Sequence, residues 1–286
     1  MASRATVSSA PPGLAPGTRI GPYAVREHLG GGGVGEVYRA EPVDGGAAVA
    51  LKVVRPELAA NAEVARRVAH EVRAAGSLSH PNLVGLVAHG EDAGVTYMAL
   101  ELIDGGTLEG RIARGGALPA ADAVERVTEV AEALDALHGR GIVHRDVKTG
   151  NVLLRGDGSA VLGDLGLAKG DGYTALTRAG RMVGTIAYAA PEVILTAEAG
   201  PAADLYALGC VAYECVAGRH PFAGRGFLEL ANAHLEEDPG DPCAGRDDAP
   251  SSLGEAIRAA LAKDPAARPP GARAYARGLR AALEAA

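Results

Sequence analysis

The chain has 286 residues, and its 28 basic and 35 acidic side chains give a formal net charge of −7. This acidic balance argues against a general binder of nucleic acid or anionic membranes, because such proteins need a basic surface. Aromatic residues make up only 3%, and tryptophan is absent, so platforms for base stacking are not expected. The hydrophobic fraction of 48% argues against global disorder, and at about 150 residues per domain the length predicts two lobes or one large domain.

The cysteines and the apolar segments indicate where the protein resides. No C-x-x-C pair occurs, so there is no zinc signature, and reduced thiols fit a cytosolic compartment. The most apolar run, residues 205–216, is shorter than the roughly 20 residues of a membrane crossing, and Glu214 interrupts it. We expect a buried helix there, with Cys210 and Cys215 in the core. The N-terminus lacks a long apolar core, so we expect no signal peptide, no membrane segment and a cytoplasmic protein.

The first part of the chain predicts a tail and then a small, mostly β lobe with one helix. Residues 1–17 are rich in serine and proline, which indicates a flexible tail. An Asp-Gly turn at 44–45 lies between two β-like runs, which indicates a hairpin. The expected elements are, in chain order, strands over 34–38 and 48–54, a helix over 62–75, and strands over 83–89 and 95–102. We place this lobe at residues 18–103.

The character of the sequence then changes, and residues 104–284 predict a larger, mostly α lobe. Apolar residues recur at steps of three and four from Val124 to His138, which predicts a long amphipathic helix. Short strands and loops are expected over 142–190. Further helices are expected over 204–217, 227–237, 251–262 and 272–284.

The first candidate functional segment in chain order is rich in glycine. Gly30, Gly32 and Gly35 form a G-x-G-x-x-G pattern, and glycines let a backbone approach phosphates closely. Alone the pattern also fits a flexible hairpin tip. A dinucleotide-binding fold requires a helix after the glycines. A strand follows here instead, which disfavours NAD and favours a glycine hairpin that folds over a nucleotide.

A lysine in an apolar strand is the second candidate. Lys52 lies within a run of apolar residues, where burial of an unpaired ammonium group is costly. A solvated edge position is one interpretation. The other is a lysine that holds phosphates and is fixed by Glu71 on the next expected helix.

Residues 144–151 are the most informative segment. Polar residues and a glycine cluster there between apolar runs, although a structural turn can use the same residue types. Asp164 follows another short apolar pair and would alone fit a turn. Together with Asn151 it offers two hard oxygen ligands, which suit Mg²⁺ bound to phosphates.

Taken in order, these segments resemble the eukaryotic-like (Hanks-type) bacterial serine/threonine protein kinases. The matching motifs are the Gly-rich loop, V-A-L-K, a helix glutamate, H-R-D-x-K-x-x-N, D-x-G and, at residues 190–192, A-P-E. Further matches are H-P-N at 80–82, D-L-Y-A-L-G at 204–209 and Arg268. The resemblance covers about residues 20 to 283 and implies an α+β, two-lobed protein kinase fold.

The resemblance also implies a set of nucleotide-binding residues. Lys52 would contact the α- and β-phosphates and pair with Glu71, Leu100 would hold the gatekeeper position, and the backbone after it would bind the adenine edge. The implied ATP-binding residues are Leu29, Gly30, Gly31, Gly32, Gly33, Gly35, Val37, Ala50, Lys52, Glu71, Glu101, Ile103 and Asp104.

The catalytic and metal-binding roles are implied in the same way. Asp146 would orient or deprotonate the substrate hydroxyl, and Lys148 would neutralise charge on the γ-phosphate. Asn151 and Asp164 would hold Mg²⁺ or Mn²⁺. The remaining implied roles are a brace of the catalytic loop by Asp204, a buried ion pair of Glu192 with Arg268, and serine/threonine specificity from Lys148 and Thr185.

The implied function is transfer of the γ-phosphate of ATP to serine and threonine hydroxyls of proteins, with autophosphorylation at Thr177 or, as second candidate, Thr174. A transient homodimer for autophosphorylation in trans is compatible with this function. A non-catalytic pseudokinase scaffold and a small-molecule phosphotransferase are the alternatives. The sequence departs from the family pattern at Thr149 and Gly150, where a proline is common after the lysine.

Overall fold

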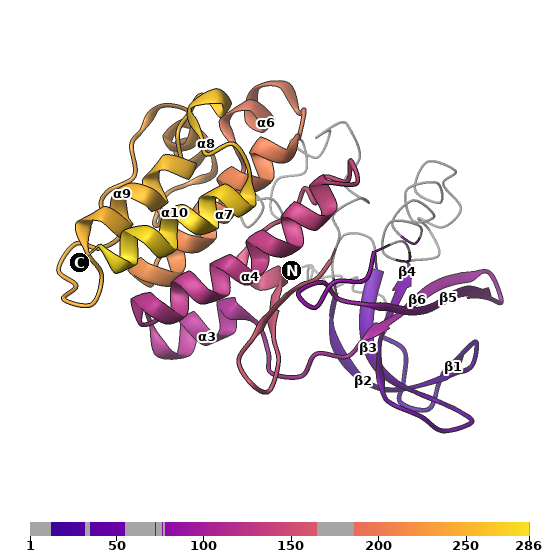
Figure 1. Ribbon diagram of the computed structural model, residues 1–286. Coiled ribbons are helices and arrows are strands. Elements are labelled where there is room, and N and C mark those ends of the chain that lie inside the picture. The colour runs from indigo at the N-terminus through magenta and orange to yellow at the C-terminus, as the bar shows by residue number, and fades with distance from the viewer. Residues whose placement is uncertain are drawn as a thin grey trace, which may run out of the picture. The chain divides into compact units, whose positions relative to one another are not determined.

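A computed structural model describes residues 13–31, 35–54, 72, 76, 78–164 and 186–285. The described chain divides into two units (Figure 1). The first unit takes the described residues up to 54 together with 86–102, and the second unit takes 78–85 together with 103–285. The second unit therefore resumes at Ile103, one residue before the start proposed from the sequence, and it also includes 78–85.

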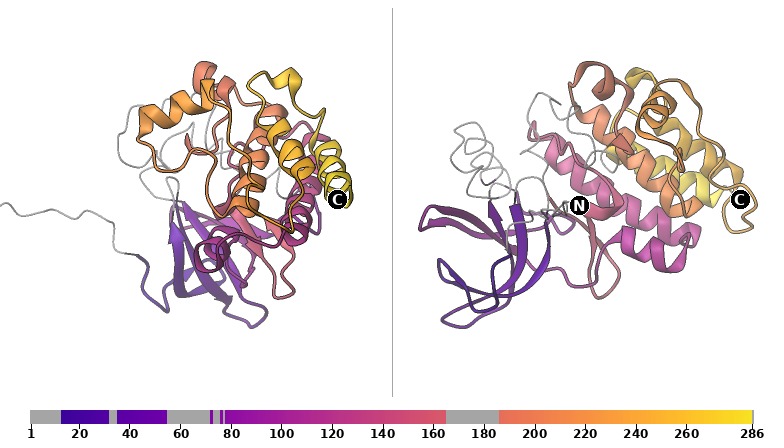
Figure 2. Two further views of the ribbon diagram at one scale, coloured as in Figure 1. Left: turned by 90° about the vertical axis from the view of Figure 1, so that its left-hand side faces the viewer. Right: turned by 180° about the vertical axis from the view of Figure 1, so that it is seen from behind.

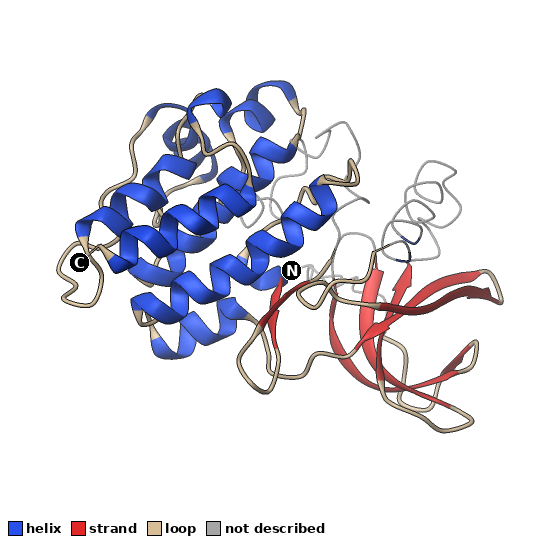
Figure 3. Cartoon of the chain, viewed as in Figure 1, coloured by secondary structure: helices blue, strands red, loops and turns tan. Residues whose placement is uncertain are grey.

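The first unit is an antiparallel sheet, drawn red in Figure 3. It has six strands in the order β1-β2-β3-β4-β6-β5. The strands are β1 Arg19–Ile20, β2 Tyr23–Gly31, β3 Gly35–Pro42, β4 Val49–Val54, β5 Leu86–Asp92 and β6 Val95–Glu101. The predicted hairpin is confirmed, since β3 pairs with β4 across the Asp-Gly turn. The strand expected over 83–89 instead begins at Leu86.

Side chains alternate between the two faces of this sheet, as the two-residue period of a strand requires. On β4, one set joins the hydrophobic core of the unit and consists of Val49, Leu51 and Val53. Ala50 and Lys52, which intervene, lie on the opposite face. This second face carries the lysine singled out in the sequence.

Part of the expected N-terminal tail is attached to the sheet. Residues 1–12 lie outside the described range. The backbone N–H of Leu14 donates to the hydroxyl of Tyr38 at 3.1 Å, and that of Gly17 donates to the carbonyl of Val25 at 2.8 Å. The described end of the tail therefore contacts strands β2 and β3.

The second unit is mostly helical and contains one small hairpin, β7 with β8 (Figure 3). Its helices are α3 Leu108–Gly115, α4 Ala120–His138, α6 Pro191–Thr196, α7 Pro201–Ala217, α8 Phe227–Glu236, α9 Ser251–Ala260 and α10 Ala272–Glu284. Its remaining elements are the 3₁₀ turns η1 Thr149–Asn151 and η4 Pro265–Ala267 and the strands β7 Val152–Leu154 and β8 Ala160–Leu162.

Helix α7 is the centre of this unit. It packs against α4 and α9, and α10 covers α4 and α9 in turn (Figure 2). A side chain at Gly209 would come within 2.9 Å of the Cβ atom of Ala260, so this glycine lets α9 approach α7 closely. Pro201 at the first helical position and the left-handed Gly218 at the end delimit α7. Among the described residues, no helix combines the length and apolar character that a membrane crossing needs.

Most helices of the second unit were expected. The predicted long helix is α4, and the four later predictions correspond to α7, α8, α9 and α10. The short helices α3 and α6 were not predicted. The helix expected over 62–75 lies, apart from Val72, outside the described residues.

Candidate active site

The carboxylate of Asp146 is the centre of the polar cluster formed by residues 144–151. Lys148 Nζ donates to Asp146 Oδ2 at 3.0 Å. Asn151 Nδ2 donates to the same oxygen at 2.9 Å and to the backbone carbonyl of Asp146 at 2.8 Å. Asp146 is 8% exposed, so a cation and an amide orient a nearly buried carboxylate. Such a group is suited to accept a proton from a hydroxyl.

Asp204, at the start of α7, holds the backbone in front of this carboxylate. Its side chain is 2% exposed and accepts from the backbone N–H of His144 at 2.7 Å and from that of Arg145 at 2.8 Å. His138 Nε2, at the end of α4, donates to the same carboxylate at 2.8 Å. The sequence predicts that Asp204 braces the catalytic loop, and hydrogen bonds of this kind are what such a role requires. His138 was not singled out there.

Buried His144 links this loop to the segment that carries Asp164. The backbone N–H of Asp146 donates to His144 Nδ1 at 3.3 Å, and His144 Nε2 donates to the carbonyl of Gly163 at 3.1 Å. Burial lowers the pKa of His144, which keeps the ring neutral. A neutral ring with one donor and one acceptor nitrogen matches both contacts.

Two non-glycine residues of the site have a left-handed backbone. Arg145 has a φ of 66° and Asp164 a φ of 53°. Such conformations persist where the surrounding structure imposes them, and they concentrate at functional sites. Here the hydrogen bonds of Asp204 and His144 supply the constraint.

The residues expected to hold a metal come from adjacent segments. The backbone N–H of Gly163 donates to the carbonyl of Asn151 at 2.9 Å, which brings the neighbouring Asp164 beside the catalytic loop. Asn151 uses its amide nitrogen on Asp146, so its amide oxygen is the atom suited to a metal. Within the described ranges, no group of three or more His, Cys, Asp or Glu side chains is placed to form a metal centre. One carboxylate and one amide oxygen fit Mg²⁺ that is also bound to phosphates.

The first unit carries three of the expected nucleotide-binding residues on one face of its sheet. Lys52, 8% exposed, is paired with Val37 on β3 and with Met98 on β6. Ala50 is paired with Leu100 on β6. Because paired residues of neighbouring strands point to the same side, these five side chains share the face opposite the hydrophobic core. Three of them were expected to bind ATP, and Leu100 was expected beside them.

The described glycines of the glycine-rich segment end β2 and begin β3. Gly30 and Gly31 end β2, next to exposed Leu29, and pair with Val37 and Glu36. At Gly35 a side chain would come within 2.2 Å of the Val53 carbonyl, so only glycine fits there. Glu101 ends β6, and Ile103 and Asp104 follow it.

Several expected site residues lie outside the described part of the chain. They are Gly32, Gly33, Glu71, Thr174, Thr177 and Thr185.

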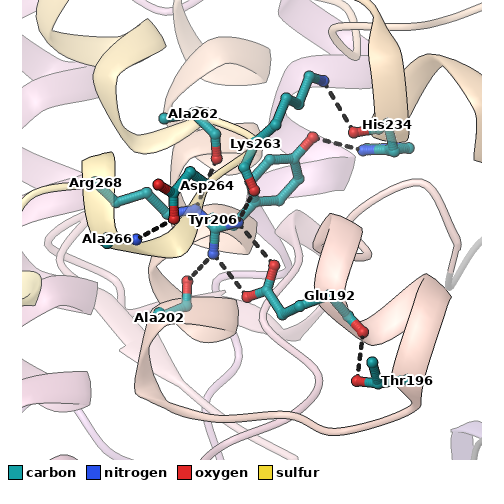
Figure 4. Close-up of polar contacts among 10 residues, drawn as sticks. All are labelled: Glu192, Thr196, Ala202, Tyr206, His234, Ala262, Lys263, Asp264, Ala266 and Arg268. Carbon is teal, nitrogen blue, oxygen red and sulfur yellow. Dashed lines mark hydrogen bonds and ion pairs between the residues drawn. The ribbon is translucent and has the colours of Figure 1, made fainter.

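The expected ion pair of Glu192 and Arg268 is present in the second unit (Figure 4). The guanidinium donates to both carboxylate oxygens of Glu192, at 2.7 and 2.8 Å. It also donates to the carbonyls of Ala202, Ala262 and Lys263. The Arg268 side chain is completely buried, so the pair joins α6, α7 and the chain before α10.

A buried histidine pair beside α8 was missed by sequence reasoning. The hydroxyl of Tyr206 lies 2.9 Å from His234 Nδ1 (Figure 4). The rings of His220 and His234 lie 5.8 Å apart, and the ring of Tyr188 lies 5.1 Å from that of His220. Burial lowers the pKa of His220 to about 4 and that of His234 to about 3. Neither histidine belongs to a sequence motif, so no sequence signal marks them.

These histidines predict a loss of stability in acid. Below pH 6.5, the usual pKa of histidine, His220 and His234 bind protons in the unfolded chain but stay neutral in the folded chain. The free energy of unfolding therefore falls as the pH drops towards 4. For His220 the lowering to about 4 corresponds to roughly 3 kcal/mol. We expect His220→Phe to flatten this pH dependence, measured by urea unfolding between pH 8 and pH 4.5. Val130→Ala, a change at a buried position of α4 that removes no titrating group, should shift stability equally at every pH. If His220→Phe kept the pH dependence of the wild type, the lowered pKa of His220 would not be a cause of the loss of stability in acid.

Comparisons with known proteins agree on one family. A family model described as "Protein kinase domain" matches residues 23–277. The chain is 38% identical over 253 residues to Serine/threonine-protein kinase PknD of Mycobacterium tuberculosis, which covers 88% of this chain and 38% of that protein. It is 36% identical over 256 residues to Serine/threonine-protein kinase PknA of the same species, which covers 88% of this chain and 59% of that protein.

A solved structure extends the similarity to three dimensions. The kinase domain of PknI from M. tuberculosis superposes with a TM-score of 0.74 at 30% identity, covering 95% of this chain and 99% of that chain. The chain thus spans nearly all of a solved domain but only 38% and 59% of the two curated relatives.

Proposed function

Because the chain belongs to the protein kinase domain family, we propose that it is an ATP-dependent serine/threonine protein kinase. It transfers the γ-phosphate of ATP to serine and threonine hydroxyls of proteins. The observation that carries this proposal is the nearly buried Asp146 carboxylate, held by Lys148 and Asn151.

The reaction follows from the charges of these groups. Asp146 accepts the proton of the acceptor hydroxyl, or orients that hydroxyl, as the oxygen attacks phosphorus. Lys148 lies within hydrogen-bonding distance of Asp146 and carries a positive charge where the transferred group gains negative charge. Asn151 and Asp164 are the residues that would hold Mg²⁺ or Mn²⁺, which neutralises phosphate charge.

The nucleotide is proposed to bind the sheet face of the first unit that lies opposite its hydrophobic core and carries Lys52. Ala50, Val37 and Leu100 offer apolar surface for a flat purine. Lys52 shares that face and supplies a cation for the phosphates. The glycine-rich residues between β2 and β3 supply backbone N–H groups for the same purpose.

The residue inventory argues against the two alternatives. A pseudokinase usually lacks the strand lysine, the catalytic aspartate or the metal aspartate, whereas Lys52, Asp146 and Asp164 are all present. A small-molecule phosphotransferase of this fold generally lacks the G-T-x-x-Y-x-A-P-E segment, which this chain has at 184–192.

The test is phosphoryl transfer by the purified chain, with labelled ATP and either a generic protein or an aminoglycoside as acceptor. We expect label on serine and threonine of the protein, only with Mg²⁺ or Mn²⁺. Label on the aminoglycoside alone would indicate a small-molecule kinase. Absence of transfer to both acceptors and to the chain itself would contradict the proposal.

The proposal includes a phosphorylation switch. A phosphate adds about −1.5 to −2 charge and can pair with a guanidinium such as that of Arg145, which precedes Asp146. We expect autophosphorylation at Thr177, with Thr174 as second candidate, and several-fold lower activity in Thr177→Ala. Mass spectrometry after incubation with ATP checks this, with Asp146→Asn as control. An unmodified Thr177 in a fully active sample would contradict the switch.

Partners and location complete the proposal. Autophosphorylation in trans would use a transient homodimer. The free thiols of Cys210, Cys215 and Cys243 support a cytoplasmic protein, because disulfides are rare there.

A further inference from the structure

Three polar side chains meet beside the catalytic loop: Tyr188 of the G-T-x-x-Y-x-A-P-E segment, and Thr149 and Glu214, to which the motifs above assign no role. The hydroxyl of Thr149 donates to Glu214 Oε2 at 3.1 Å and lies 2.9 Å from the hydroxyl of Tyr188. The hydroxyl of Tyr188 donates to the same Glu214 oxygen at 2.5 Å. The contacts join η1, the segment before α6 and the interior of α7, so a single cluster ties three separate elements together.

The cluster is largely removed from water, because Thr149 is buried and Tyr188 and Glu214 are partly buried. Thr149 is 0% exposed. Burial raises the pKa of Glu214 above its usual value, and the hydrogen bonds from Tyr188 and Thr149 offset only part of that rise. A partly buried carboxylate that loses one of its donors keeps much of its cost of desolvation. The two hydroxyls therefore hold Glu214, and Glu214 in turn fixes where Thr149 can lie.

Thr149 lies next to the residues that orient the catalytic carboxylate. Lys148 precedes it and donates to Asp146 Oδ2. Within η1 the backbone N–H of Asn151 donates to the carbonyl of Lys148 at 3.0 Å, so the turn around Thr149 connects both partners of Asp146. The anchored side chain of Thr149 therefore restrains this turn.

We propose, on the premise of the kinase activity proposed above, that Thr149 is a positioning residue whose hydroxyl, bound to Glu214 beside Tyr188, fixes Lys148 against Asp146. The proline that is common at this position in the family has no hydroxyl. Here the position is instead held by a hydrogen bond to Glu214 of α7. Glu214, which in the sequence only interrupts an apolar run, is the anchor.

The test is a double-substitution cycle measured on phosphoryl transfer to a generic acceptor protein at saturating ATP and Mg²⁺. We expect Thr149→Val to lower kcat about tenfold, the size of one hydrogen bond to a charged group. Thr149→Ser, which keeps the hydroxyl, should stay within about twofold of wild type. In a Lys148→Ala background, Thr149→Val should lower kcat by less than about twofold, because the group it positions is gone. Merely lost stability would lower kcat equally in both backgrounds.

Thr128→Val is the matched control. Thr128 is 2% exposed, and its hydroxyl donates to the Val124 carbonyl within α4, so this change also removes a buried hydroxyl but leaves the cluster intact. We expect wild-type kcat from it. The concentration of folded protein in each variant is determined by titration with ADP and Mg²⁺, and kcat is expressed per folded molecule. If Thr149→Val does not fold, Tyr188→Phe removes a donor to Glu214 from the other side and should lower kcat similarly.

The outcomes distinguish failure of the positioning role from failure of the proposed kinase function. Wild-type kcat in Thr149→Val, or an equal loss in both backgrounds, would overturn the positioning role and leave the kinase function intact. No transfer by the wild-type chain would overturn the proposed function, and the positioning role with it.

Discussion

Asp146→Asn is expected to lower kcat by about three orders of magnitude while the chain stays folded. The amide cannot accept a proton from the acceptor hydroxyl, and it removes the charge that Lys148 contacts at 3.0 Å. An amide oxygen can still accept from Asn151, so the loop keeps a partner at this position. Transfer of labelled phosphate to a protein acceptor, with unfolding followed by circular dichroism, measures both effects.

The control is the same substitution at Asp157. This exposed aspartate lies in the turn between β7 and β8, where it accepts from the backbone and hydroxyl of Ser159. Asp157→Asn should leave kcat unchanged, because no reacting group lies in that turn. Near wild-type turnover in Asp146→Asn would remove the basis of the kinase assignment.

Local sequence patterns were sufficient for much of the fold. The Asp-Gly turn predicted the β3–β4 hairpin, and apolar spacing predicted α4, because both signals arise within a few residues. Helices α3 and α6 were missed for local reasons too. Helix α3 is short and contains Gly110, a weak helix former, and it depends on a cap from Thr107. Helix α6 has only six residues and begins inside the A-P-E motif.

In the candidate site, contacts between residues close in sequence could be predicted, and contacts between distant residues could not. The contacts of Asp146 with Lys148 and Asn151 join residues close in sequence, so one motif marks them all. Thr149 and Glu214 are 65 residues apart, and nothing in either segment indicates that they meet. Contacts of this kind depend on how helices pack, and a single sequence does not encode that packing in any short pattern.

Arg268→Ala is expected to lower the free energy of unfolding by about 3 kcal/mol, which is typical when one partner of a buried ion pair is removed. The substitution leaves the Glu192 carboxylate, 23% exposed, without the guanidinium that binds both its oxygens. It also removes the donor to the backbone carbonyls of Ala202, Ala262 and Lys263. Arg268→Lys should recover only part of the loss, because an ammonium group cannot match the planar fork of contacts. Urea unfolding followed by circular dichroism measures both variants.

The exposed pair of Arg225 and Glu237 provides the comparison that isolates burial. Its guanidinium also binds both carboxylate oxygens, at 2.5 and 2.8 Å, but the side chains are 34% and 45% exposed. Water can solvate either partner once the other is removed, so Arg225→Ala should shift the urea midpoint far less than Arg268→Ala. Equal shifts would mean that the Arg268 contribution comes from the bidentate geometry alone, and that neither its burial nor its carbonyl contacts add to it.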